Sequence, residues 1–222
     1  MYIFVITSTL NPRIGVLSPE VRYQQTLNTI KSIKEKANGS LILLVDSSPQ
    51  PVEQSYIDDI KSKVDYFISL SNHTHALDLG NAGLKSPAEC YIMVIALDII
   101  KNLALKDVKR IFKITGRGEL TDRFNIDDYD DPEIDGKYVF KKSVESWMAR
   151  QLRLVDTRLW SFDYKLLEEV NQLVRDAYSD CMATRFDLEH TYYKLIDKNK
   201  LFEKDVIGMK CQLASDGVII DE

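Results

Sequence analysis

Runs of apolar residues, separated by amphipathic or polar stretches, organise the first half of the chain. The most continuous runs cover residues 2–6, 41–46, 65–70 and 110–115. Strands that helices cover on both faces have this pattern, as in a parallel sheet. The segments between the runs predict helices, one after Ser18-Pro19 and one over residues 52–63. The strand–helix repeats predict a right-handed βαβαβ start of the doubly wound type.

The first predicted helix has an apolar stripe that we expect to face the sheet. The stripe consists of Val21, Leu27, Ile30 and Ile33. The Asn38-Gly39 pair ends the helix, because these residues adopt the left-handed backbone of a helix terminus easily.

The stretch from Gly80 to Arg117 joins a glycine-rich loop, a long apolar helix and the strand over residues 110–115. Ser86 is the predicted N-cap of the helix, because proline follows it and Glu89 stands at capping-box spacing. Lys85 would lie beside the free amides of the first turn, which favour an anion. The alternative for Lys85 is an ordinary surface lysine.

Apolar and polar residues alternate more in the second half, where residues 137–141 and 151–162 are predicted strands. Alternation is typical of antiparallel pairs. Helices are expected over residues 164–173 and 187–196, and two short strands near the end of the chain. The whole pattern predicts a single α/β domain over residues 1–222, with a mixed sheet that is parallel in its first half and flanked by helices.

Composition narrows the partners and the compartment. The chain has 222 residues and a net charge of −5, which does not favour a nucleic-acid partner, because phosphates require a basic face. Cys90, Cys181 and Cys211 are widely spaced, which predicts buried thiols in a reducing compartment. No apolar run reaches the roughly 18–20 residues of a membrane span, and the first residues lack the features of a signal peptide. We therefore expect a cytoplasmic protein.

Three common motifs are missing from the sequence. The first strand is not followed by G-x-G-x-x-G, which argues against a dinucleotide enzyme. There is no Walker A motif and no G-x-S-x-G elbow, which argues against P-loop enzymes and α/β-hydrolases.

Polar side chains follow the first two predicted strands. Thr7, Ser8 and Thr9 end the first strand, and Arg13 lies in the loop after it. Asp46 ends the second strand. Open α/β sheets bind ligands at this edge, where an acid commonly contacts a ribose or a base. The alternative for Asp46 is a turn residue.

Two cations accompany the strand over residues 110–115. Lys113 interrupts an apolar run and needs a carboxylate or a ligand as partner if it is buried. Arg117 follows Gly116 and offers a planar fork suited to phosphate or carboxylate. The alternative is that both cations pair with acids of the protein.

Two polar segments contain possible metal ligands. Asp127 and Asp128 begin an acidic run that could supply oxygen ligands to a divalent cation. His73 and His75 form a His-x-His pair in the polar stretch over residues 71–79. The alternative for both segments is a solvated loop.

A possible proton acceptor lies late in the chain. Glu189 and His190 stand at the start of the helix predicted over residues 187–196, and both side chain types can take a proton. The alternative is a capping acid followed by a packed histidine.

The chain resembles the GT-A-type glycosyltransferases, in particular small viral and bacterial members with a G-K-G-E-like helix start and a K-I-S-G-R-like strand. The two corresponding elements here are Leu84 to Glu89 and Lys113 to Arg117. The segment Thr157 to Ser161 fits the same pattern, as does Glu189-His190 with the tyrosines that follow.

The resemblance implies transfer of a sugar from a nucleoside diphosphate sugar to the hydroxyl of a glycan or other acceptor. Residues 1–117 would bind the nucleotide and residues 118–222 would form the acceptor side. Its implied donor-binding residues are Thr7, Ser8, Thr9, Arg13, Asp46, Lys85, Lys113 and Arg117. Its implied catalytic residues are Arg117, as a cation that stabilises the leaving diphosphate, and Glu189 as base, with His190 or Asp156 as alternatives.

The sequence departs from the GT-A pattern at the end of the fourth strand. That strand normally ends in Asp-x-Asp, which holds a divalent metal on the diphosphate, but here it ends in Thr115-Gly116-Arg117. Three interpretations stay open: Lys85 and Arg117 act without a metal, the Asp127-Asp128 loop supplies a Mn²⁺ or Mg²⁺ ion, or transferase activity has been lost. A non-catalytic nucleotide- or sugar-binding protein and a nucleotidyltransferase on a related sheet are therefore alternatives.

Overall fold

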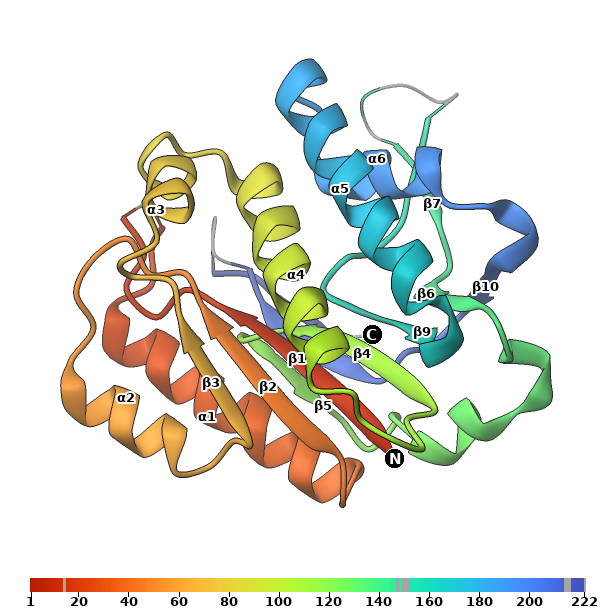
Figure 1. Cartoon of the computed structure of the whole chain (residues 1–222), viewed down its shortest axis with the longest axis horizontal. Coiled ribbons are helices and arrows are strands. Elements are labelled where there is room, and N and C mark those ends of the chain that lie inside the picture. Colours follow the sequence, from red (N-terminus) through yellow and green to blue (C-terminus); the bar gives the residue numbers. More distant parts are fainter. Residues whose placement is uncertain (14, 147, 149–151, 214–216, 222) are drawn as a thin grey trace.

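The computed structural model describes residues 1–13, 15–146, 148, 152–213 and 217–221. Its central sheet has the strand order β10-β6-β9-β4-β1-β2-β3 (Figure 1). The seven strands are β1 (Tyr2–Ser8), β2 (Leu41–Asp46), β3 (Tyr66–Ser69), β4 (Arg110–Thr115), β6 (Tyr138–Lys141), β9 (Leu159–Asp163) and β10 (Leu201–Lys204). Only β9 runs against its neighbours, so the sheet is mixed and mostly parallel.

Helices cover both faces of this sheet. The α-helices are α1 (Pro19–Lys36), α2 (Gln54–Lys61), α3 (Thr74–Asn81), α4 (Lys85–Asn102), α5 (Leu167–Thr184) and α6 (Leu188–Leu195). Short 3-10 helices occupy Ile126–Asp130, Pro132–Ile134, Tyr164–Leu166 and Lys198–Lys200. In Figure 1, α1 and α2 lie on one face of the sheet, and α4 and α5 lie on the other.

The pleat of β1 explains this arrangement, because successive side chains point to opposite faces. Ile3 and Val5 pack in the core beneath α4, α5 and α6. Phe4 and Ile6 pack in the second core with residues of α1 and α2. A strand that is apolar at every position is therefore buried on both sides, as the sequence predicts.

Two small sheets complete the fold. One consists of β12 (Ile219–Asp221), β11 (Met209–Gln212) and β5 (Gly118–Leu120), so the end of the chain pairs with the segment that follows β4. The other pairs β7 (Val144–Glu145) with β8 (Arg153–Leu154).

The predicted fold class is confirmed: the chain is a single α/β domain with a mixed sheet flanked by helices. Every apolar run of the first half is a strand. The strand predicted over residues 151–162 is instead divided into β8 and β9, and β9 forms the predicted antiparallel pair with β6. All three cysteines are buried free thiols. Among the described helices we find none with the length and apolar character that a bilayer crossing requires.

Three local predictions are wrong. Residues 71–79 are not simply a solvated loop, because α3 begins at Thr74. Ser86 does not cap α4: Leu84 is the N-cap residue, and the Ser86 hydroxyl accepts a hydrogen bond from the Leu188 amide instead. Val21 is exposed and does not belong to the buried face of α1. That face consists of Arg22, Thr26, Thr29, Ile30, Ser32 and Ile33.

Candidate active site

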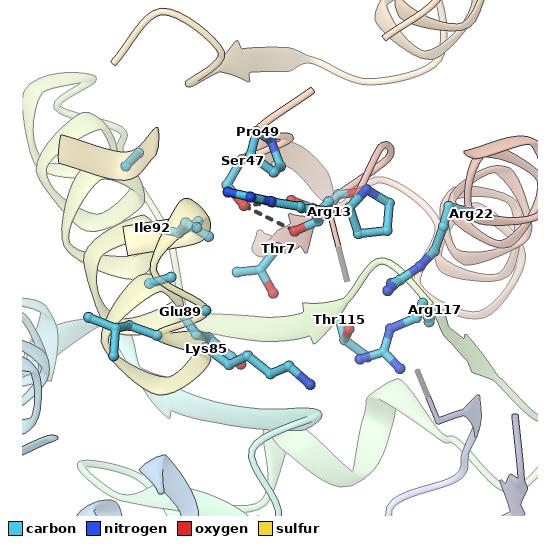
Figure 2. Close-up of a pocket in the computed structure, with 18 of the residues that line it drawn as sticks. Thr7, Arg13, Arg22, Ser47, Pro49, Lys85, Glu89, Ile92, Thr115 and Arg117 are labelled. Atoms are coloured by element: carbon cyan, nitrogen blue, oxygen red, sulfur yellow. Dashed lines mark hydrogen bonds between the residues drawn. The ribbon is translucent and has the colours of Figure 1, made fainter. Parts of the chain in front are cut away.

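A pocket of about 370 Å³ opens at the carboxyl ends of β1 and β4. The chain proceeds from β1 to β2 and β3 on one side, while β4 lies on the other side of β1, so this is the point where the strand order reverses. Ligands of open α/β sheets bind at such a point. The walls come from the starts of α1 and α4, from α3, and from the loop after β2 (Figure 2).

Thr7, Ser8 and Thr9 line the pocket, as predicted, and Gly116 sets the spacing of the two strand ends. The Gly116 amide donates to the carbonyl of Thr7 (2.8 Å), and its carbonyl accepts from Thr26 Oγ1 (3.1 Å). A Cβ atom at Gly116 would lie 3.1 Å from the Ser8 side chain, tighter than ordinary side-chain packing. Glycine therefore suits the close approach of β4 to β1, because a larger residue would require the Ser8 side chain to shift.

Asp46 lies beneath this pocket and does not line it, so a direct contact with ribose or base is not possible in this conformation. Its carboxylate accepts hydrogen bonds from the Leu10 amide (2.9 Å) and from the amide and hydroxyl of Ser48 (3.2 and 3.0 Å). Burial raises its pKa to about 6, although these hydrogen bonds oppose the shift. Asp46 therefore ties the loop after β1 to the loop after β2 and positions the wall of the pocket.

Four cations line the described part of the pocket: Arg13, Arg22, Lys85 and Arg117. Figure 2 shows Lys85 extending from α4 across the pocket towards Arg117, while Arg22 approaches from α1. Arg117 Nη1 donates to the carbonyl of Gln212 (2.8 Å), and Arg13 makes a long hydrogen bond to Asn81 (3.4 Å). Lys85 and Arg117 therefore line one cleft.

Arg22 is the pocket residue that sequence analysis missed. Its side chain is 8% exposed, and its Nε has no hydrogen-bond partner among the described residues. Burial, and then the charge of Arg117, lower the pKa of Arg22 to about 10, so it remains charged at neutral pH. The signal in the sequence was an arginine one helical turn before Thr26, on the face of α1 that also carries Ile30 and Ile33.

Glu89 forms the opposite wall, where it pairs with Lys113. Lys113 is 1% exposed, and its ammonium donates to the carboxylate of Glu89 and to the carbonyl of Thr157 (2.6 Å). Lys113 does not line the pocket, so its predicted contact with a donor is not made by this geometry. The alternative, pairing with an acid of the protein, describes Lys113 correctly.

Glu189 and His190 lie on α6 and, like Asp46 and Lys113, do not line the pocket. Glu189 Oε1 accepts a hydrogen bond from Thr157 Oγ1 (3.0 Å). Burial, and then the charge of Glu89, raise the pKa of Glu189. His190 uses both ring nitrogens, one to Asp187 (2.5 Å) and one to Ser146 (2.7 Å), which is the packed histidine of the alternative interpretation.

The predicted metal ligands do not gather at the pocket. Asp128 pairs with Lys204, and Asp130 pairs with Lys109 and accepts from Tyr2 OH, at the amino end of β1. His73 and His75 contact Tyr91 and Tyr178. Within the described ranges no three His, Cys, Asp or Glu side chains form a metal-binding group. The residues at the end of β4 thus do not fit the metal that Asp-x-Asp holds in GT-A enzymes.

Solved glycosyltransferases share this architecture. One is a glycosyltransferase involved in glycosylation of the major capsid of PBCV-1, at a TM-score of 0.50 and 10% identity, over 91% of this chain and 81% of that one. Another is the galactosyltransferase LgtC in complex with donor and acceptor sugar analogs, at a TM-score of 0.53 and 8% identity, over 90% of this chain and 72% of that one. A third is the mannosyltransferase Ktr4p from S. cerevisiae, at a TM-score of 0.54 and 10% identity, over 91% of this chain and 68% of that one.

The chain has a GT-A glycosyltransferase fold. At these identities the likeness is one of fold. Neither a protein-family model nor the sequence of a curated protein matches the chain.

Proposed function

We propose that this protein is a glycosyltransferase that moves a sugar from a nucleoside diphosphate sugar to a hydroxyl acceptor. The observation that carries the proposal is the excess of positive charge in the pocket of a GT-A fold. Four cations line its described walls, against one carboxylate, Glu89, which is already paired with Lys113. A ligand with at least two negative charges would balance this site.

In this proposal the nucleoside lies over the end of β1 and the loop after β2. Thr9 and Ser47 hydroxyls lie 3.1 Å apart there, beside Pro49, and offer hydrogen bonds and a flat apolar surface. Arg13 borders the same side. The diphosphate would then extend towards Lys85 and Arg117, over the end of β4.

The reaction breaks the bond between the anomeric carbon and the diphosphate oxygen. The acceptor oxygen forms the new bond to that carbon, its proton passes to a base, and the nucleoside diphosphate leaves. Negative charge develops on the leaving group, and Lys85 and Arg117 are cations that would stabilise it without reorganisation.

We assign the base to Glu189. This residue does not line the donor pocket but lies on α6 close enough to the wall residue Glu89 for that charge to act on it, so the acceptor would have to approach from the α6 side. The raised pKa of Glu189 makes it a better proton acceptor than an ordinary carboxylate. Glu89 is less suited because its carboxylate is already paired with the ammonium of Lys113. In the proposal Glu89 accepts hydrogen bonds from sugar hydroxyls at the pocket wall.

The test is an assay of nucleoside diphosphate release with UDP- and GDP-sugars and a panel of hydroxyl acceptors. Arg117→Ala should reduce turnover by about 10²–10³-fold, the scale of losing one preorganised donor. Arg175→Ala is the matched control, because Arg175 pairs with Asp98 on α4 and does not line the pocket.

Other outcomes would point elsewhere. Thermal stabilisation by nucleotide sugars without turnover would indicate a binding protein. Release of pyrophosphate from a nucleoside triphosphate would indicate a nucleotidyltransferase. Equal turnover of Arg117→Ala and wild type would remove Arg117 from the mechanism.

A further inference from the structure

Arg22 is a buried cation that lacks a counterion in the described part of the chain. Its side chain is more than nine-tenths buried, and its Nε meets no acceptor there. Its charged neighbour at the pocket is a second arginine, Arg117, which lowers the pKa of Arg22 further. Like charges at a buried site are unfavourable unless an anion joins them.

Hydroxyl groups surround the two arginines. Thr7, Ser8, Thr26 and Thr115 line a recess of about 10 Å³ with Arg22 and Arg117, which has room for about one water molecule. A phosphate group would therefore lie in the main pocket, which both arginines also line, and Figure 2 shows both arginines directed to the open space that Lys85 reaches from the other side. Guanidinium groups bind phosphate oxygens through two parallel N–H donors.

Among the residues that the structure describes, the same position lacks the groups that a divalent cation would require. The end of β4 carries Thr115, Gly116 and Arg117, and the carboxylate that lines the described pocket, Glu89, is held by Lys113. A cation placed between two arginines and a lysine would be repelled.

We propose that Arg22 and Arg117, with Lys85, form a diphosphate site that works without a divalent metal. Arg22 is thereby a ligand-binding residue, and the two arginines supply the positive charge that a metal provides in Asp-x-Asp enzymes. The inference deepens the proposed function, since the diphosphate is that of the nucleotide donor, but the site would bind a diphosphate whether or not a sugar is transferred.

The first experiment measures binding of inorganic pyrophosphate by calorimetry in EDTA. Wild-type protein should bind, and Arg22→Ala should weaken the affinity by about 10- to 100-fold, the range for a hydrogen bond to a charged group. Arg22→Lys should recover part of the loss, because the charge returns without the planar fork. Arg175→Ala should bind as wild type does.

The second experiment measures thermal unfolding without ligand and excludes a purely structural role. Arg22→Met replaces an unpaired buried charge with an apolar chain of similar length, so its midpoint should rise by about 2–4 °C. Pyrophosphate should raise the midpoint of wild type and not that of Arg22→Met.

Some results would overturn the inference. The inference is wrong if pyrophosphate binding requires Mn²⁺ or Mg²⁺, or if Arg22→Ala binds pyrophosphate with the affinity of wild type. It is also wrong if Arg22→Met unfolds at a lower temperature than wild type in the absence of ligand. The proposed function would fail in a different way. In that case pyrophosphate would bind in EDTA, but no sugar would be transferred from any nucleotide sugar. Transfer that survives Arg22→Ala unchanged would keep the function and remove this site.

Discussion

Arg22 and Lys113 are both buried cations near one pocket, and their surroundings are opposite. Lys113 donates to a carboxylate and to a backbone carbonyl, so its charge is satisfied within the fold. Within the described ranges, Arg22 Nε has no hydrogen-bond partner and a second arginine lies beside it. A buried charge with partners stabilises a structure from within, whereas a buried polar group without a partner requires an explanation, which the proposed diphosphate site supplies.

The largest expected effect concerns Glu189, which lies near the Lys113–Glu89 pair. If Glu189 is the base, Glu189→Gln should lower turnover by about 10²–10⁴-fold. In wild type, turnover should rise with pH through a pKa above the usual 4.5, because the charged carboxylate is the active form. That rise should be absent from the pH–rate profile of the variant.

A structural role would move a different measurement. Glu189→Gln would then change the unfolding midpoint and leave turnover and its pH profile as in wild type. In that case the carboxylate side of the pocket would serve only the fold, and the base would have to be sought elsewhere.

The next test separates the two members of the Lys113–Glu89 pair. Glu89→Gln keeps an acceptor oxygen but removes the counter-charge of the Lys113 ammonium, whose side chain is 2% exposed, so it should lower the free energy of unfolding by about 2–3 kcal/mol. Lys113→Met leaves Glu89, whose side chain is 33% exposed and can be hydrated, so it should cost less. Chemical denaturation of both variants measures the difference. A larger loss in Lys113→Met would contradict this account of the pair.

The smallest expected effect concerns Asp46, a buried anion that is hydrogen-bonded and still carries a raised pKa. Because the folded state holds its proton up to about pH 6 and the unfolded state only to about 3.8, stability falls as pH rises between these values. Asp46→Asn should remove this slope, which we expect to amount to up to about 2 kcal/mol. Unfolding free energies of both proteins at pH 4 and pH 7 check it, and parallel curves would refute it.

Most of the fold follows from the sequence, because its signals are local. Each of these signals consists of a few neighbouring residues. Examples are the apolar strands, the start of α1 at Ser18-Pro19 and its end before Asn38-Gly39. The missed helix α3 is short and begins in a polar stretch without a side-chain cap, so its stability comes from packing on α4. Residue 151, the first of a predicted strand, lies outside the described residues.

The site was less accessible to sequence reasoning. The cations Lys85 and Arg117 stand beside turn signals and were found, whereas Arg22 lies inside a helix, where an arginine is ordinarily solvated. The partner of Lys113 is 24 positions away on another element. The order of the strands in the sheet decides which acid pairs with which cation. The pattern of residues along the chain does not reveal this pairing.

The tight contact at Gly116 also limits how this pocket can be altered. A Cβ atom introduced there would lie 3.1 Å from the Ser8 side chain and 3.3 Å from Thr26 Oγ1, so these side chains would have to move by a few tenths of an ångström. An engineer who wished to install an acidic metal-binding pair on this strand would therefore have to adjust Ser8 and Thr26 at the same time. A single acidic substitution at the end of β4 thus involves one side chain of β1 and one of α1 as well.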